Sequence, residues 1–241
     1  MIAFAKSDVG KAREINEDYY YISNVNDNIH VYILADGMGG YNGGEVASKL
    51  ATSATLSYIQ SNFESIPKEK DDILNLVKSA IEYANMVVYE KSNQDKELEG
   101  MGTTIAVCLI YGNKAYIGHV GDSRIYRIRK EFIRRLTQDH SYVEKLVKDG
   151  TITKQEAINH PKKNMLMKAL GCKVFVEPDV NVKGFIKDDI ILMCSDGLTN
   201  MVQEEEIYRI IKKEGTLAAE KLVEKANENG GYDNITAIVI R

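Results

Sequence analysis

The sequence has little cysteine and little proline, and both shortages limit what the chain can be. Its 241 residues include only three cysteines, Cys108, Cys172 and Cys194, which are too few and too scattered for a disulfide framework. A reducing, cytoplasmic setting is therefore expected. Only three prolines occur, and no Gly/Ser-rich stretch separates two halves, so we predict no interdomain linker. A single domain over residues 1–241 is expected.

A basic excess and a long apolar run are also missing. The chain has 31 Lys and Arg against 35 Asp and Glu, a net charge of −4, whereas nucleic-acid binders generally show a basic stripe and a high pI. Nucleic acid is therefore not an expected partner. No stretch approaches the roughly 20 apolar residues that span a bilayer, and the segment from Met1 to Gly10 lacks the pattern of a signal peptide. We expect no membrane insertion.

Short apolar runs separated by turns are numerous, and the helical patterns come in pairs. Strands are predicted over residues 19–22, 30–35, 104–111, 114–120, 123–128, 131–136, 190–194 and 234–240. Helices are predicted over residues 47–58, 73–88, 143–147, 207–211 and 218–226, and from a capping box at Thr153. Because helices do not alternate with strands, a doubly wound sheet is disfavoured. A largely antiparallel sheet or sandwich with helices packed on its faces is expected.

Acidic residues recur where these predicted strands meet turns. Any single Asp-Gly pair is most often only a turn. If the strand ends share one edge of the sheet, however, the carboxylates converge and repel, and the folded chain needs a cation to tolerate them. The acidic groups concerned are Glu17-Asp18, Asp36, Asp122, Asp196 and Asp233.

Hard oxygen ligands of this kind select Mg²⁺ or Mn²⁺. Two such ions about 3.5–4 Å apart would activate a hydroxide for in-line attack on phosphorus. The glycine-rich segment from Asp36 to Glu45 is not a Walker A loop, because it lacks Gly-Lys-Ser/Thr. Its glycines would let a backbone carbonyl such as that of Gly37 reach a hard cation. Arg13 is by itself a typical surface arginine, but near such a cluster its planar guanidinium suits phosphate.

Other chemistries have weaker support in the residues. The four histidines form no zinc motif. The run Gly121-Asp122-Ser123 is similar to a serine-esterase block, but no Asp-x-x-His follows it. Cys194 could be a nucleophile, yet a buried strand cysteine is the favoured interpretation, and no arginine closes a phosphate loop after it.

Several segments follow one another in a specific order along the chain. They are Arg13-x-x-Asn16-Glu17-Asp18, Leu34-Ala-Asp36-Gly37-Met-Gly-Gly, Gly102-Thr103-Thr104, Gly118-His119-Val120-Gly121-Asp122-Ser123-Arg124, Thr137-Gln-Asp139-His140-Ser141, Ala169-Leu-Gly171, Ser195-Asp196-Gly197-Leu198 and Asp233-Asn234-Ile-Thr236. In this order they resemble the motifs of the metal-dependent protein Ser/Thr phosphatases of the PP2C (PPM) family, in the short form typical of bacteria.

The resemblance implies an α+β fold in α-β-β-α layers. Pairs of helices would flank a central antiparallel β-sandwich, with a flap at about residues 141–170 and a metal site at one edge of the sandwich. It also implies roles for individual residues. Asp36 would bridge two metals, Gly37 would offer its carbonyl to one of them, and Asp196 and Asp233 would complete the other. Asp122 would join Asp196 at a third metal, Arg13 would bind phosphate, and Glu17 and Asp18 would either bind metal or support the residues that do.

The implied function is Mn²⁺- or Mg²⁺-dependent hydrolysis of phosphoserine and phosphothreonine in proteins, by in-line attack of a metal-bridging hydroxide. The implied partners are phosphoproteins and a cognate Ser/Thr kinase, and a monomer is expected. Met38 stands where many eukaryotic members have a histidine proposed as general acid, and a thioether cannot protonate a leaving alkoxide. Two alternatives are a non-catalytic pseudophosphatase and an esterase that uses Ser123.

Overall fold

Two antiparallel sheets form the centre of the molecule. The computed structural model describes residues 1–27, 29–38 and 43–241. Sheet A has the strand order β1-β11-β10-β7-β8, with β1 at Ala3–Asp8, β7 at Arg124–Arg129, β8 at Phe132–Arg135, β10 at Ile190–Cys194 and β11 at Ile235–Ile240. Sheet B has the order β2-β3-β5-β6-β9, with β2 at Asp18–Ile22, β3 at His30–Met38, β5 at Ile105–Tyr111, β6 at Lys114–Val120 and β9 at Asp179–Gly184. A short β4 at Gly102–Thr103 pairs with β3.

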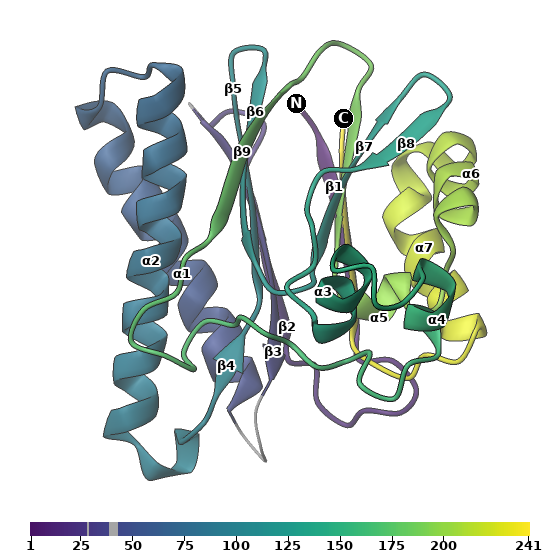
Figure 1. Cartoon of the computed structure of the whole chain (residues 1–241). Helices are drawn as coiled ribbons and strands as arrows, with labels where there is room; N and C mark the ends of the chain where they lie inside the picture. Colours follow the sequence, from purple (N-terminus) through teal and green to yellow (C-terminus); the bar gives the residue numbers. More distant parts are fainter. Residues whose placement is uncertain (28, 39–42) are drawn as a thin grey trace.

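Helices cover the outer face of each sheet (Figure 1). Sheet B is covered by α1 (Gly44–Asn62) and α2 (Lys70–Gln94), and sheet A by α6 (Glu204–Glu214) and α7 (Ala218–Glu228). The four-residue α5 (Asp196–Thr199) follows β10. Short 3-10 turns lie at Phe63–Ser65, Lys96–Leu98 and Gly215–Leu217. The predicted α-β-β-α layering is therefore confirmed.

Because of strand periodicity, one run of apolar residues contributes to two cores, one between a sheet and its helices and one between the two sheets. In β3, Val31 and Ile33 pack under the α1–α2 layer, whereas Tyr32 and Leu34 face the other sheet, because successive side chains point to opposite faces. In β11 the same alternation sends Val239 toward α6 and α7 and Ile238 into the space between the sheets. The buried apolar layers hold the two sheets in a fixed mutual position, and with them the strand ends that carry the acidic residues.

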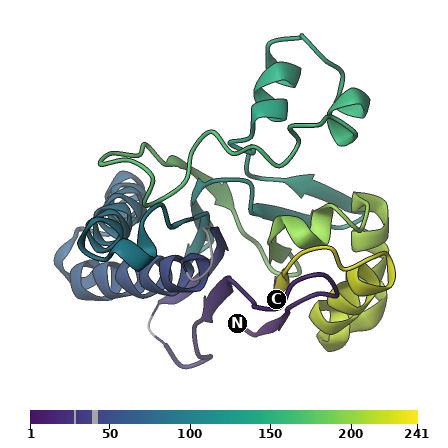
Figure 2. The ribbon, with the colours of Figure 1, turned by 90° about the horizontal axis from the view of Figure 1, so that it is seen from below.

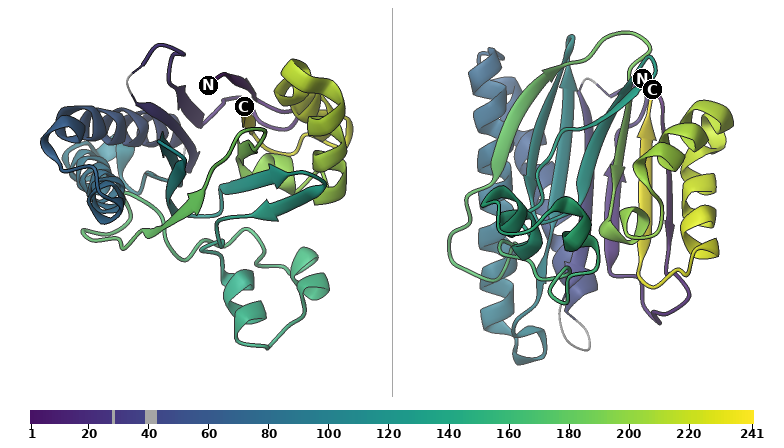
Figure 3. Two further views of the ribbon diagram at one scale, coloured as in Figure 1. Left: turned by 90° about the horizontal axis from the view of Figure 1, so that it is seen from above. Right: turned by 45° about the vertical axis from the view of Figure 1, so that its right-hand side comes forward.

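The segment 141–170 carries two short helices, α3 (Tyr142–Lys148) and α4 (Lys154–Ile158). It projects away from the sandwich, as Figures 2 and 3 show. Thr153 and Glu156 form the predicted capping box, and Ser141 caps α3. The two stems of the segment meet through a backbone bond from Tyr142 N to Met165 O at 2.8 Å.

No helix in the described ranges is long and apolar enough to cross a membrane.

Candidate metal and phosphate site

The strand ends next to the predicted acidic residues lie at the end of the sandwich opposite the two termini (Figure 1), and most of these acidic residues line one pocket there. This pocket has a volume of about 200 Å³. Its lining comprises Arg13, Glu17, Asp36, Gly37, Met38, Thr104, Asp122, Asn164, Leu166, Asp196 and Asp233. Asp18 is not part of the lining and lies buried behind it.

Asp18 and Asp36 are direct cross-strand partners on β2 and β3. One Asp18 oxygen, Oδ2, accepts hydrogen bonds from the hydroxyls of Ser195 at 2.8 Å and Thr236 at 2.6 Å. The other oxygen, Oδ1, is buried and has no hydrogen-bond partner among the described residues. Because an unsatisfied buried carboxylate oxygen is costly, Asp18 Oδ1 marks a place where a cation or a water it holds would fit.

Asp196 and Asp233 adjoin two neighbouring antiparallel strands of sheet A, one after the end of β10 and the other before the start of β11. Asp196 opens α5 immediately after β10, and Asp233 stands just before β11. The two segments touch so closely that a Cβ on Gly197 would lie 2.0 Å from the carbonyl oxygen of Asn234. Asp233 also accepts a hydrogen bond from Arg13 Nη2 at 3.0 Å.

Asp122 is carried by the sharp turn between β6 and β7. The preceding Gly121 has φ +105°, and a Cβ there would lie 2.6 Å from the side chain of Thr104. Ser123 Oγ lies 2.8 Å from Thr104 Oγ1, and Thr104 Oγ1 also accepts from the backbone N–H of Asp36 at 3.0 Å. Thr104 therefore links the Asp122 turn to the end of β3.

Glu17 and Gly37 adjoin each other across a narrow backbone contact. Gly37 N donates to Glu17 O at 3.1 Å, and a Cβ on Gly37 would lie 2.1 Å from the carbonyl oxygen of Gly44. The side chain of Asn234 accepts from Glu17 N at 2.8 Å and donates to Ile15 O at 2.9 Å, so it holds the loop that carries Glu17.

Burial and mutual repulsion raise the pKa of four aspartates in this group, Asp18, Asp36, Asp122 and Asp196. The pKa of Asp196 rises to about 6, that of Asp18 to about 7 and that of Asp122 to about 8, first through burial and then through neighbouring carboxylates. The pKa of Asp36 lies well above its ordinary value for the same two reasons. Arg13 is the one cationic side chain among the described residues that line the pocket, so the protein alone does not balance this charge.

The donor set fits hard divalent cations. It includes several carboxylates and one glycine, Gly37, and carboxylate and carbonyl oxygens are the ligands that Mg²⁺ and Mn²⁺ prefer. One of these oxygens, Asp18 Oδ1, has no hydrogen-bond partner among the described residues. The carboxyls with raised pKa values would ionise fully only if positive charge were nearby. The residues present thus fit the cations that the sequence predicts.

All the predicted site residues lie at this pocket or directly behind it. Residues 39–42 of the predicted glycine-rich segment lie outside the described residues. Sequence reasoning missed Asn164 and Leu166, which reach the pocket from the projecting segment, and it missed Ser195 and Thr236 as the supports of Asp18. The two hydroxyls stand inside the last two ordered motifs, whereas Asn164 and Leu166 belong to none of them.

The two alternative nucleophiles do not fit a catalytic role. Cys194 is fully buried in β10, and burial raises the pKa of its thiol to about 12. Ser123 is buried, and its hydroxyl is hydrogen-bonded to that of Thr104. Neither His119 nor His140 lines the pocket, so neither is placed there to activate a serine.

Comparison with known proteins places this geometry in a family. The family model "Protein phosphatase 2C" matches residues 10–225. The chain belongs to the protein phosphatase 2C family. Among its relatives is the "Serine/threonine phosphatase stp" of Listeria monocytogenes serotype 4b (strain F2365), which is 38% identical over 242 residues that cover all of this chain and 95% of the relative.

Two solved structures of phosphatase 2C relatives share the fold. The Mycobacterium tuberculosis serine/threonine phosphatase PstP/Ppp is 34% identical and superimposes with a TM-score of 0.88, over 99% of this chain and 97% of the other. A catalytic domain of PstP in complex with two manganese ions is 34% identical, with a TM-score of 0.85 over 99% of this chain and 96% of that one. The fold expected from the sequence is therefore confirmed.

Proposed function

We propose that this chain is a protein phosphatase that hydrolyses phosphoserine and phosphothreonine in other proteins. The observation that carries the proposal is the convergence of Asp36, Asp122, Asp196 and Asp233 on one pocket beside a single arginine. Such a pocket becomes a receptor for a phosphate dianion only when divalent cations neutralise it. Membership of the phosphatase 2C family supports the same reaction.

The carboxyls divide into groups that would hold Mn²⁺ or Mg²⁺. Asp36 interacts electrostatically with the other four aspartates and would contribute to two ions, with the carbonyl of Gly37 beside it. Asp196 and Asp233 would complete one of these sites, and Asp122 with Asp196 would form a third. Glu17 and Asp18 would act as ligands or as supports for them. When bound, such cations act as Lewis acids and activate a water for in-line attack on phosphorus.

Arg13 is the phosphate-binding side chain of this proposal. Its guanidinium is half exposed and reaches Asp233 through Nη2, so its remaining donors are available to oxygens of a phosphate in the pocket. The pairing with Asp233 holds the long side chain in place before substrate arrives. Less conformational entropy is then lost on binding.

The leaving group needs a proton, and Met38 cannot supply it. Its thioether lines the pocket but is at most a weak acceptor. The described lining residues include no histidine, lysine or tyrosine. We therefore assign the proton on the leaving alkoxide to a water in the pocket.

The finer expectations about partners and setting belong to the same proposal. Phosphoproteins are the substrates, a Ser/Thr kinase phosphorylates them, and the chain acts as a monomer. It works as one domain with residues 141–170 as a flap, which is supported by a family match that spans residues 10–225. A reducing, cytoplasmic setting agrees with free thiols at Cys108, Cys172 and Cys194.

The test is hydrolysis of a phosphothreonine peptide with Mn²⁺ and with EDTA, by the wild type and by Asp36→Asn. We expect Mn²⁺-dependent turnover in the wild type and none above background in the variant, because the amide removes the charge that would hold two ions. Calorimetry with Mn²⁺ accompanies the assay. Activity on carboxylic ester substrates that survives EDTA would instead support the esterase alternative. Mn²⁺ binding without turnover on any phosphopeptide would support a pseudophosphatase.

A further inference from the structure

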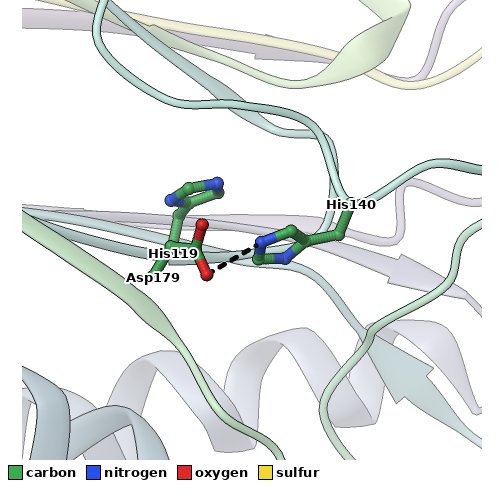
Figure 4. Close-up of side chains that lie close together, drawn as sticks. All are labelled: His119, His140 and Asp179. Carbon is green, nitrogen blue, oxygen red and sulfur yellow. Dashed lines mark ion pairs between the residues drawn. The ribbon is translucent and has the colours of Figure 1, made fainter. Parts of the chain in front are cut away.

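A second polar cluster lies outside the pocket, at the base of the projecting segment. It consists of His119 on β6, His140 just before the segment and Asp179 on β9 (Figure 4). The two imidazoles stack with centroids 4.7 Å apart, and His140 Nε2 lies 3.3 Å from Asp179 Oδ1. Both imidazole side chains are largely buried. Because burying a polar ring is costly unless its nitrogens are hydrogen-bonded, their hydrogen bonds indicate what they do.

The hydrogen bonds determine which nitrogen of each ring carries the proton. The backbone N–H of Gly121 can only donate, and it points to Nδ1 of His140 at 3.2 Å. In the neutral ring the proton is therefore on Nε2, toward Asp179. In His119 the proton is also on Nε2, which faces the carbonyl oxygen of Gln138 at 2.8 Å. Because Nε2 of His140 has no free lone pair, the cluster does not offer a cation the nitrogens it would need.

His140 instead satisfies both peptide groups of Gly121. Its backbone N–H donates to Gly121 O at 2.9 Å, while its ring accepts from Gly121 N. The ring can do so because burial and then the neighbouring His119 lower the pKa of His140 to about 4, so Nδ1 keeps its lone pair at neutral pH. Gly121 has φ +105° and directly precedes Asp122.

The same residue also joins the two stems of the projecting segment. The carbonyl oxygen of His140 accepts from Met167 N at 2.7 Å. One position further back, Asp139 binds Arg124 with Oδ2 at 2.6 Å from Nη2, on the other side of the Asp122 turn. Residues 139 and 140 thus hold the turn from both sides.

We propose that His140 is a positioning residue for cation binding, which acts through Gly121 to hold the Asp122 carboxylate toward the pocket. The inference rests on the proposed function, since it assigns Asp122 to a cation site. The acceptor at the Nδ1 position is the group that matters. Asp179 lies 3.3 Å from the other ring nitrogen, Nε2, and is not part of the hydrogen bonds to Gly121.

Two amide variants separate the two ring nitrogens. Asn places an acceptor oxygen near the position of Nδ1, whereas Gln reaches the position of Nε2. We expect His140→Asn to bind Mn²⁺ like the wild type. His140→Gln and His140→Ala should weaken one Mn²⁺ site by roughly ten- to a hundredfold, the usual effect of removing a group that orients a metal ligand. Asp179→Asn is the matched control and should leave Mn²⁺ binding unchanged.

The measurement is calorimetric titration with Mn²⁺ in the absence of substrate, with phosphopeptide turnover recorded separately. Thermal unfolding in EDTA shows that each variant is folded. Asp122→Asn should lose the same site as His140→Gln, and the double variant should lose nothing more. The inference is overturned if Gln preserves binding as well as Asn, if the losses of Asp122→Asn and His140→Gln add, or if Asp179→Asn removes a Mn²⁺ site. A wild type that neither binds Mn²⁺ nor turns over phosphopeptide overturns the proposed function itself, and the role of His140 with it.

Discussion

At the scale of single residues, Arg13 contacts Asp233 and would also bind the phosphate of the substrate. In the structure its Nη2 lies 3.0 Å from Asp233 Oδ2. A phosphate in the pocket would bind the donors that Asp233 leaves free, because its oxygens match the planar guanidinium. The side chain can therefore hold substrate without contributing to the cation sites.

Replacing Arg13 should affect substrate binding more than metal binding. We expect Arg13→Ala to lower kcat/KM for a phosphothreonine peptide by roughly 10- to 150-fold, mainly through KM, because a charged hydrogen bond contributes about 1.5–3 kcal/mol. Arg13→Lys should recover only part of this loss, since an ammonium cannot bind phosphate through two parallel donors. Lys11→Ala, a nearby exposed cation, is the control in steady-state kinetics. An unchanged KM would contradict the role assigned to Arg13.

The residue types at the site could be predicted from the sequence, whereas their supports could not. The acidic residues and Arg13 stand in ordered motifs, so their chemistry is evident from residue type and order alone. Ser195 and Thr236 support Asp18 from 177 and 218 positions away. No local pattern in the sequence reports a hydrogen bond over that distance.

Among elements, the first turn of α5 and the loop before β11 depend on each other. They carry Asp196 and Asp233, and they meet where Gly197 leaves no room for a side chain. An element of only four residues has little helical stability of its own. Its position therefore depends on this contact with the neighbouring strand.

A methyl group at this contact should disrupt the cation site. In Gly197→Ala the new Cβ would lie 2.0 Å from the backbone of Asn234, so α5 must shift relative to β11. We expect a lower Tm by several degrees, because overpacking typically costs about 1–3 kcal/mol, together with weaker Mn²⁺ binding in calorimetry. Gly184→Ala is the matched control, since nothing lies within 4 Å of a Cβ there. Equal Mn²⁺ affinity in both variants would show that the contact does not position the two carboxylates.

Elements with strong apolar periodicity were predicted well, whereas two of the four edge strands, β1 and β9, were missed. The strands Lys114–Val120 and Ile190–Cys194 have the bounds that the sequence predicts. Strands β1 and β9 were not predicted because their side chains are mostly half-buried and include charged residues. Neither strand therefore shows a clear alternation of apolar and polar residues. The strand predicted over residues 104–111 begins at Ile105, because the N–H of Thr104 bonds to Asp36 O and precedes the β5 ladder.

At the scale of the whole molecule, the proposed cation site should make the free energy of unfolding depend on pH and on metal. Asp196, Asp18 and Asp122 have folded pKa values of about 6, 7 and 8, against 3.8 for an ordinary aspartate. The folded state therefore holds protons that the unfolded chain has already released. The free energy of unfolding falls as pH rises between the two values.

The Tm in EDTA should consequently be higher near about pH 5 than near about pH 8. Mn²⁺ should raise the Tm most at the alkaline end of this window, because a ligand that binds only the folded state stabilises it and the ionised carboxyls bind cations best. Asp36→Asn, which removes one buried charge, should flatten the pH dependence in EDTA. The measurement is thermal unfolding at several pH values with and without Mn²⁺. A Tm in EDTA that rises steadily from about pH 5 to about pH 8 would contradict this account.

The convergence of the site is a property of the complete fold. The sequence places acidic residues at strand ends but does not say which ends lie together. That depends on the antiparallel pairing of β2 with β3 and of β10 with both β7 and β11. Asn164 and Leu166 depend further on how the projecting segment returns to the sheet, which no periodic pattern describes.

The interior position of β11 in sheet A affects when the protein can complete its folding during synthesis. This strand lies inside sheet A, paired on one side with β1 and on the other with β10, yet it is made after every other strand described. The segments with Asp18, Asp36, Asp122 and Asp196 are therefore translated before Asp233 and Thr236. The first strand must wait for a partner more than 200 residues away, and such long-range pairing is slow. A nascent chain short of β11 would hold an incomplete set of metal ligands, so catalytic competence would come only with the last stage of folding.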